Sequence, residues 1–60
     1  MRPTPTDIAQ RLHSQATRLE LDAARARHNG TPNIADVFER LARDVRAQVA
    51  EIAAQVRRAA

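Results

Sequence analysis

The 60-residue sequence contains no cysteine, no tryptophan and no tyrosine, and its single aromatic residue is Phe38. The absence of cysteine excludes a disulfide framework and a thiolate metal site. Chains of this size bury only about 60% of the surface that they expose when unfolded, and they usually need an additional source of stability. Since disulfides and thiolate ligands are excluded, association with a partner is the support that remains.

Long apolar runs and lysine are also missing. No run approaches the roughly 18 consecutive apolar residues of a membrane-spanning helix, and residues 1–5 lack the apolar segment of a signal peptide. These absences predict a cytoplasmic protein that does not enter a membrane. All ten basic residues are arginine, which is typical of a GC-rich bacterial or phage genome. The net charge of +3 is too small by itself to identify a nucleic-acid-binding protein.

The residues that are abundant favour helices. Hydrophobic residues make up 43% of the chain, and thirteen of them are alanine. Thr4, Pro5 and Asp7 have the spacing of a capping box with proline at the first helical position, so a helix is expected at about residues 5–28. Its apolar residues recur at steps of three and four and form a narrow stripe made of Ile8, Leu12, Ala16, Leu19, Ala23 and Ala26.

A tight turn is expected at residues 29–32. Asn29 or Gly30 can adopt the left-handed backbone conformation that ends a helix, and Pro32 cannot continue one. A second helix is expected at about residues 33–59. A connection this short brings two helices back antiparallel, so the sequence predicts a single all-α domain over residues 1–60, an antiparallel two-helix hairpin.

The second helix has the broader apolar stripe, which spans well over 100° and is wider than one facing helix can cover. We therefore expect two hairpins to pair into a four-helix bundle, with a two-fold dimer as the commonest symmetry. The expected interface consists mainly of large apolar residues of the second helix, with two leucines of the first: Ile34, Val37, Phe38, Leu41, Val45, Val49, Ile52, Val56, Leu12 and Leu19.

Three glutamines lie on or beside the stripes, namely Gln15, Gln48 and Gln55. Polar residues at a helix–helix contact can fix the register and the oligomeric state. They can equally mark the wet edge of the contact, and the sequence leaves both interpretations open. Leu21 points away from the stripe of the first helix and is either an exposed leucine or a contact to a further partner.

The sequence has no catalytic or ligand-binding motif. Ser14 is the only serine, and the two histidines, His13 and His28, lie off the apolar stripe. There is no Glu-x-x-His pair for a metal site in a helical bundle and no glycine-rich phosphate loop. We therefore expect a non-enzymatic protein without cofactor, metal or small-molecule substrate.

Six arginines are candidates for binding a nucleic-acid backbone. Arg11, Arg18 and Arg25 recur every seven residues and form a ridge on the first helix, whereas Arg40, Arg43 and Arg46 cluster in the second. Backbone contacts of this kind would make binding strongly salt-dependent. The alternative interpretation is a solvated surface, because acidic residues are interleaved at helical spacing and no aromatic residue is available to stack on bases.

Two functional hypotheses follow. The leading hypothesis is a small protein–protein interaction module that self-associates through the second helix, or a regulator or inhibitor of phage or plasmid type that docks on a larger bacterial protein. The alternative is a dimeric nucleic-acid-binding regulator that uses the arginine ridge.

Overall fold

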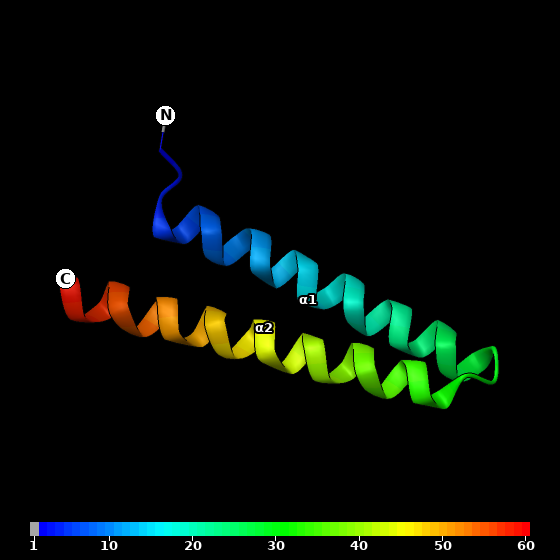
Figure 1. Ribbon diagram of the computed structural model, residues 1–60. Helices are drawn as coiled ribbons and strands as arrows, with labels where there is room; N and C mark the ends of the chain where they lie inside the picture. Colours follow the sequence, from blue (N-terminus) through cyan, green and yellow to red (C-terminus); the bar gives the residue numbers. More distant parts are fainter. Residues whose placement is uncertain (1) are drawn as a thin grey trace.

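The computed structural model describes residues 2–60 as two antiparallel helices joined by a short turn (Figure 1). Helix α1 spans Pro5–His28 and helix α2 spans Pro32–Ala59. Over these described residues there is no strand, so the predicted all-helical class with two helices is confirmed. Helix α2 begins at Pro32, one residue earlier than predicted, because proline fits the first helical position, where no backbone donor is needed.

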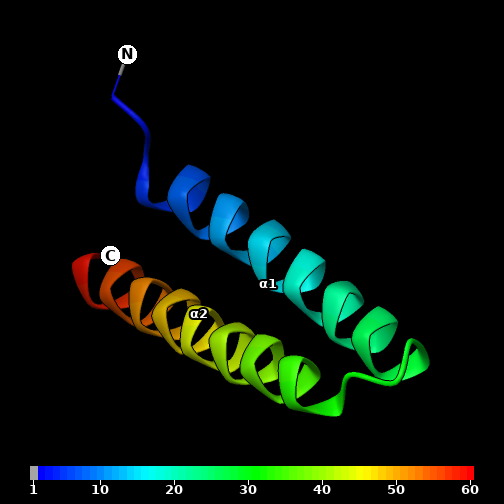
Figure 2. The same ribbon diagram turned by 45° about the vertical axis from the view of Figure 1, so that its right-hand side comes forward.

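The hairpin is an elongated plate one helix thick (Figure 2). Its principal extents are 46 × 22 × 11 Å, and the last of these is about the diameter of a single helix. The radius of gyration is 14.0 Å, whereas a compact domain of this length has a radius of about 10 Å. Each helix therefore has one neighbour only, and the two broad faces of the plate have no covering layer within the chain.

The start of α1 has the capping box that the sequence predicts. The Asp7 backbone N–H donates to Thr4 Oγ1 (3.1 Å), and the Thr4 backbone N–H donates to Asp7 Oδ2 (3.3 Å). Pro5 follows the cap at the first helical position. These bonds satisfy two backbone donors that a helix start otherwise leaves without a partner.

The turn relies on Gly30, whose φ of +82° lies in the left-handed region. Asn29 closes α1 by donating its backbone N–H to Arg25 O (2.9 Å). Thr31 does not cap α2 with its side chain; its hydroxyl donates instead to Ala26 O (2.9 Å), and its backbone N–H bonds to the same carbonyl (2.8 Å). The turn thus ties the end of α1 to the residue that precedes α2.

The buried centre of the contact between the helices is made of alanine. Within residues 2–60, every buried residue is an alanine, and together these residues form what we call the alanine seam: Ala16, Ala23, Ala26, Ala35 and Ala42. Ala16 and Ala23 are seven residues apart in α1, as are Ala35 and Ala42 in α2, which is the repeat that keeps one line of a helix against its neighbour. Only a methyl group separates the backbones there, so the helices can approach closely.

The hairpin has two unlike ends. The alanine seam covers the half next to the turn, whereas the half that carries the two chain ends has no fully buried residue within the described part of the chain. Neither α1 nor α2 is long and apolar enough to cross a membrane over residues 2–60.

Candidate protein interaction surface

The two flanks of the alanine seam carry different side chains. In both helices, a residue that forms an ion pair follows four residues after a buried alanine. These residues are Glu20 and Arg27 in α1 and Glu39 and Arg46 in α2. Four residues before a buried alanine stands a large apolar residue, as at Leu12, Leu19 and Phe38. At ~100° per residue, the positions four residues after and four residues before an alanine are rotated about 40° from it in opposite directions. Each helix therefore has one charged flank and one apolar flank.

Ion pairs across the seam show that the charged flanks share one face of the plate. Arg27 of α1 reaches Glu39 and Asp36 of α2, and Arg46 of α2 reaches Glu20 of α1. Because these bonds join the two helices on the same side, the apolar flanks must lie together on the opposite side. The hairpin therefore has an ion-pair face and an apolar face.

The ion-pair face near the turn is organised by Arg27. Its Nε donates to Glu39 Oε1 (3.0 Å), and its Nη2 lies 3.0 Å from Asp36 Oδ1 and 2.8 Å from Glu39 Oε1. The hydrogen bond to Glu39, followed by the bond to Asp36, raises the pKa of Arg27 above its ordinary value. These acids therefore bind an arginine of the other helix, a pairing that helical spacing within α2 does not reveal.

Farther from the turn, Arg46 contacts two side chains of α1 across the seam. One guanidinium nitrogen donates to Glu20, and another lies 3.2 Å from His13 Nδ1. An arginine can only donate, so His13 Nδ1 is the acceptor in this contact. All these groups are substantially exposed, so the bonds orient the helices more than they stabilise them.

The apolar face is exposed. Ile34 is 50% exposed, Leu41 45% and Val37 55%, whereas Leu12, Leu19, Phe38, Val45 and Ile52 are half-buried along the same side of the seam. At ~100° per residue, Ile34, Leu41, Val45 and Ile52 lie within about 40° of one another, almost at right angles to the line that faces α1. The centre of the apolar stripe of α2 thus points out of the hairpin.

The structure brings most of the predicted interface residues together on this face. Ile34, Phe38, Leu41, Val45, Ile52 and Val56 lie along α2, and Leu12 and Leu19 lie beside them on α1. Ile8 of α1 extends the face and is 40% exposed. Val37 lies at its outer rim, and Val49 lies nearer the seam. We call the set without Val37 and Val49 the apolar face: Ile8, Leu12, Leu19, Ile34, Phe38, Leu41, Val45, Ile52 and Val56.

The six candidate arginines do not form one surface. Arg11, Arg18 and Arg25 line the outer edge of α1, as their seven-residue spacing predicts. Arg40 points to the outer edge of α2, and Arg46 is bound on the ion-pair face. Arg43 lies beside Arg46 at a shallow hollow that also includes Glu20 and Glu39. Among the six, only the three arginines of α1 follow one line along a helix.

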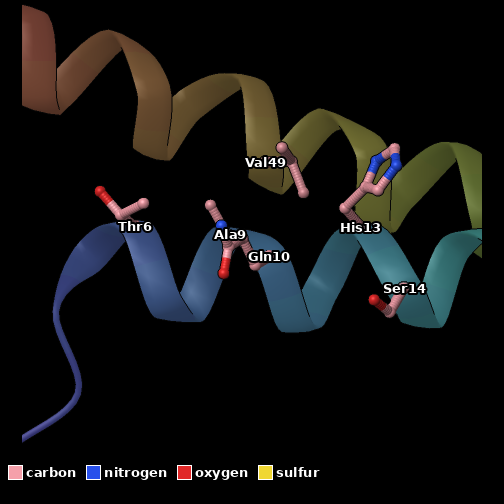
Figure 3. A pocket seen from close by; sticks show the side chains of 6 residues that line it. All are labelled: Thr6, Ala9, Gln10, His13, Ser14 and Val49. Carbon is pink, nitrogen blue, oxygen red and sulfur yellow. The ribbon is translucent and has the colours of Figure 1, made fainter.

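A shallow hollow of about 450 Å³ lies between the helices at the open end, lined by Thr6, Ala9, Gln10, His13, Ser14 and Val49 (Figure 3). Figure 3 shows His13 turned towards α2 and Ser14 turned away from it, so the two side chains do not face each other. Two further hollows at this end are lined by Pro5, Thr6, Ile52 and Val56, among others. Over residues 2–60, no three His, Asp or Glu side chains are grouped closely enough to hold a metal ion.

Sequence patterns located the apolar stripes but not the residues that join the helices. Ala16, Ala23 and Ala26 were predicted as members of the α1 stripe, whereas the structure places them with Ala35 and Ala42 in the buried centre of the contact. A signal was present, since alanine recurs at seven-residue spacing in both helices. The ion pairs of Arg27 and Arg46 have no sequence signal, because their partners lie on the other helix.

Comparison with known proteins gives no further guide to function, since no protein-family model, curated protein or solved structure matches the chain.

Proposed function

We propose that this chain is a protein–protein interaction module that self-associates through its apolar face. The observation that carries the proposal is the exposure of large apolar side chains on one side of a plate whose other side holds the ion pairs. Contiguous apolar patches on a protein surface mark sites of association. A second hairpin laid on this face would complete a four-helix bundle.

The solvent-accessible area of the hairpin supports a second hairpin as the partner that covers the apolar face. The hairpin exposes 4997 Å², whereas a compact monomer of 6.7 kDa exposes about 3,900 Å². The excess of about 1,100 Å² is somewhat more than the roughly 800 Å² that each partner contributes to a stable interface of standard size. A second copy of the chain could bury such an area, with apolar residues against apolar residues.

The proposal is tested by measuring molar mass in solution with light scattering or sedimentation equilibrium from about 1 to 100 µM. We expect the mass of a dimer at the upper end, and dissociation when Leu41→Glu and Ile52→Glu place charges on the apolar face. The matched control is Leu21→Glu, because Leu21 is 61% exposed on the outer side of α1 and lies off this face. A folded wild-type monomer at 100 µM would overturn self-association and favour a larger protein as the occupant.

Nucleic-acid binding is the second candidate, and the observation that favours it is the exposed ridge of Arg11, Arg18 and Arg25. Successive arginines of this ridge are about 10 Å apart along α1 at ~1.5 Å per residue. A gel-shift titration at several salt concentrations tests it. Binding that weakens steeply with salt and is lost when all three arginines are changed to glutamine would support this function, and no binding at low salt would exclude it.

A further inference from the structure

The large residues at the centre of the apolar stripe of α2 are spaced symmetrically. Ile34 and Leu41 are seven residues apart, Leu41 and Val45 four, and Val45 and Ile52 seven again. The spacing reads the same in both directions about the position of Arg43. In an antiparallel pair of identical helices centred there, Ile34 would face Ile52 of the second copy, and Leu41 would face its Val45.

On α1, charged residues at the rim of the apolar face are also placed symmetrically. At ~100° per residue, Arg11 and Asp22 lie closest to that face among the charged residues of α1. Their midpoint lies between residues 16 and 17. In an antiparallel pair of α1 helices centred there, each Arg11 would lie opposite an Asp22 of the other copy, and Arg25 would lie close to Asp7.

The two centres of symmetry lie at nearly the same level of the hairpin. A turn centred on Gly30 places α1 and α2 residues that are equally distant from it side by side, so residue 43 lies level with about residue 17. One two-fold axis perpendicular to the helices therefore satisfies both patterns at once. The two helices do not have to shift along each other for both patterns to share this axis.

We propose that two hairpins pair through their apolar faces with their turns at opposite ends, so that α2 packs antiparallel on α2 of the second copy and α1 on α1. This inference rests on the proposed self-association and specifies its geometry. The interface is isologous, since each contact occurs twice about the axis.

The rims of the face distinguish this arrangement from one with the turns at the same end. The outer rim of the apolar face on α2 holds Val37, Gln48 and Gln55, which carry no charge. With the turns at the same end, α1 would lie on α2 of the second copy, and Arg11 would meet this uncharged rim. With the turns at opposite ends, the charged rim of α1 meets the α1 rim of the second copy, and Arg11 lies opposite Asp22. The uncharged rim of α2 then meets the α2 rim of the second copy.

Gln15 gains a role in the proposed dimer. It lies in the middle of the α1 part of the apolar face, between Leu12 and Leu19, and is about one and a half residues from the two-fold axis. The side-chain amide both donates and accepts hydrogen bonds, so the Gln15 amides of the two copies can bond to each other across the axis. A polar pair at this place would penalise shifted registers.

The test uses single cysteines, since the wild-type chain contains none. In the proposed dimer, Gln15→Cys lies within reach of its own counterpart, because the two positions are offset by only about 5 Å along the helices. We expect mild oxidation to convert most of this variant into a covalent dimer. The matched control is Ser14→Cys, the neighbouring position, whose side chain is turned away from α2 and off the apolar face (Figure 3).

A mixture of Gln15→Cys and Val45→Cys proteins tests the other arrangement. With the turns at the same end, position 15 faces position 45 of the second copy, and the two Gln15 positions lie on diagonal helices, beyond the roughly 7 Å that a disulfide spans. A predominant mixed disulfide, identified by mass, with no Gln15→Cys homodimer would overturn the proposed geometry while a dimeric mass still supported self-association. A monomeric wild type would remove both proposals.

A charge exchange provides a second measurement that does not depend on disulfide formation. Arg11→Asp and Asp22→Arg should each weaken dimerisation by about three- to tenfold, because each creates two like-charged contacts at the rim. The double variant should recover most of the loss, because it restores opposite charges with the sides exchanged. Circular dichroism verifies that every variant is helical, and a double variant weaker than both single ones would contradict the pairing.

Discussion

The half of the hairpin next to the turn and the half that carries the chain ends are built from the same helices but packed differently. Next to the turn, alanines separate the backbones and are completely enclosed. At the open end, Ile8 and Val56 are about 40% exposed and shallow hollows lie between the helices. The line of small residues ends between the halves, because Val49 and Val56 follow Ala35 and Ala42 at seven-residue spacing in α2. The difference shows that small side chains enclose the contact next to the turn, whereas larger and partly exposed side chains lie along it at the open end.

The largest expected effect comes from comparing Ala35 with Ala53. The two alanines are 18 residues apart, five full turns, so they lie on one line of α2. Ala35→Leu should destabilise the fold by about 1–3 kcal/mol, because a larger side chain cannot enter the closed seam without separating the helices. Ala53→Leu should be neutral or stabilising, because Ala53 is exposed and lines an open hollow. Urea unfolding at equal protein concentration measures both, and equal losses would abolish the distinction between the halves.

The turn provides the next largest effect. Gly30→Ala should cost about 1–2 kcal/mol, because a φ of +82° is unfavourable for a residue with a Cβ. An added Cβ meets no atom within 4 Å, so the loss reflects the backbone and not a collision. Gly30→Asn should cost less, because asparagine tolerates this conformation. Thermal unfolding of the two variants measures the difference, and identical behaviour of asparagine and alanine would contradict this explanation.

Removing the cap of α1 should affect the open half alone. Thr4→Ala should cost about 1 kcal/mol, because it removes the Oγ1 atom that accepts a hydrogen bond from the Asp7 backbone N–H. Hydrogen exchange should accelerate in the first turns of α1, whereas the amides around Ala23 and Ala35 should keep their protection. Acceleration throughout the chain would show that the two halves unfold as one unit and not independently.

The smallest effect is expected for the ion pair in the middle of the plate. Glu20→Gln should cost less than about 1 kcal/mol, because both Glu20 and Arg46 are substantially exposed. The loss should disappear at high salt, which screens the wild-type pair as well. Melting curves at low and high ionic strength measure this, and a loss that salt does not reduce would indicate a contact other than the ion pair.

The helices could be predicted from the sequence because their signals are local. The cap at Thr4, the glycine at position 30 and the spacing of apolar residues depend on neighbours within a few residues. The pairing of Arg27 with Asp36 and Glu39 involves residues of two helices. Within α2 alone, Asp36 and Glu39 have the spacing to pair with Arg40 and Arg43, and only the placement of α1 favours Arg27.

The sequence by itself determined two amphipathic helices, their antiparallel course and an apolar stripe too wide for one neighbour. Only the tertiary structure decided which part of that stripe the neighbour takes. The alanines line the contact because small side chains allow the closest approach of two backbones. The larger residues are left on one face, since a helix that touches its neighbour along one line cannot also cover residues a quarter-turn away.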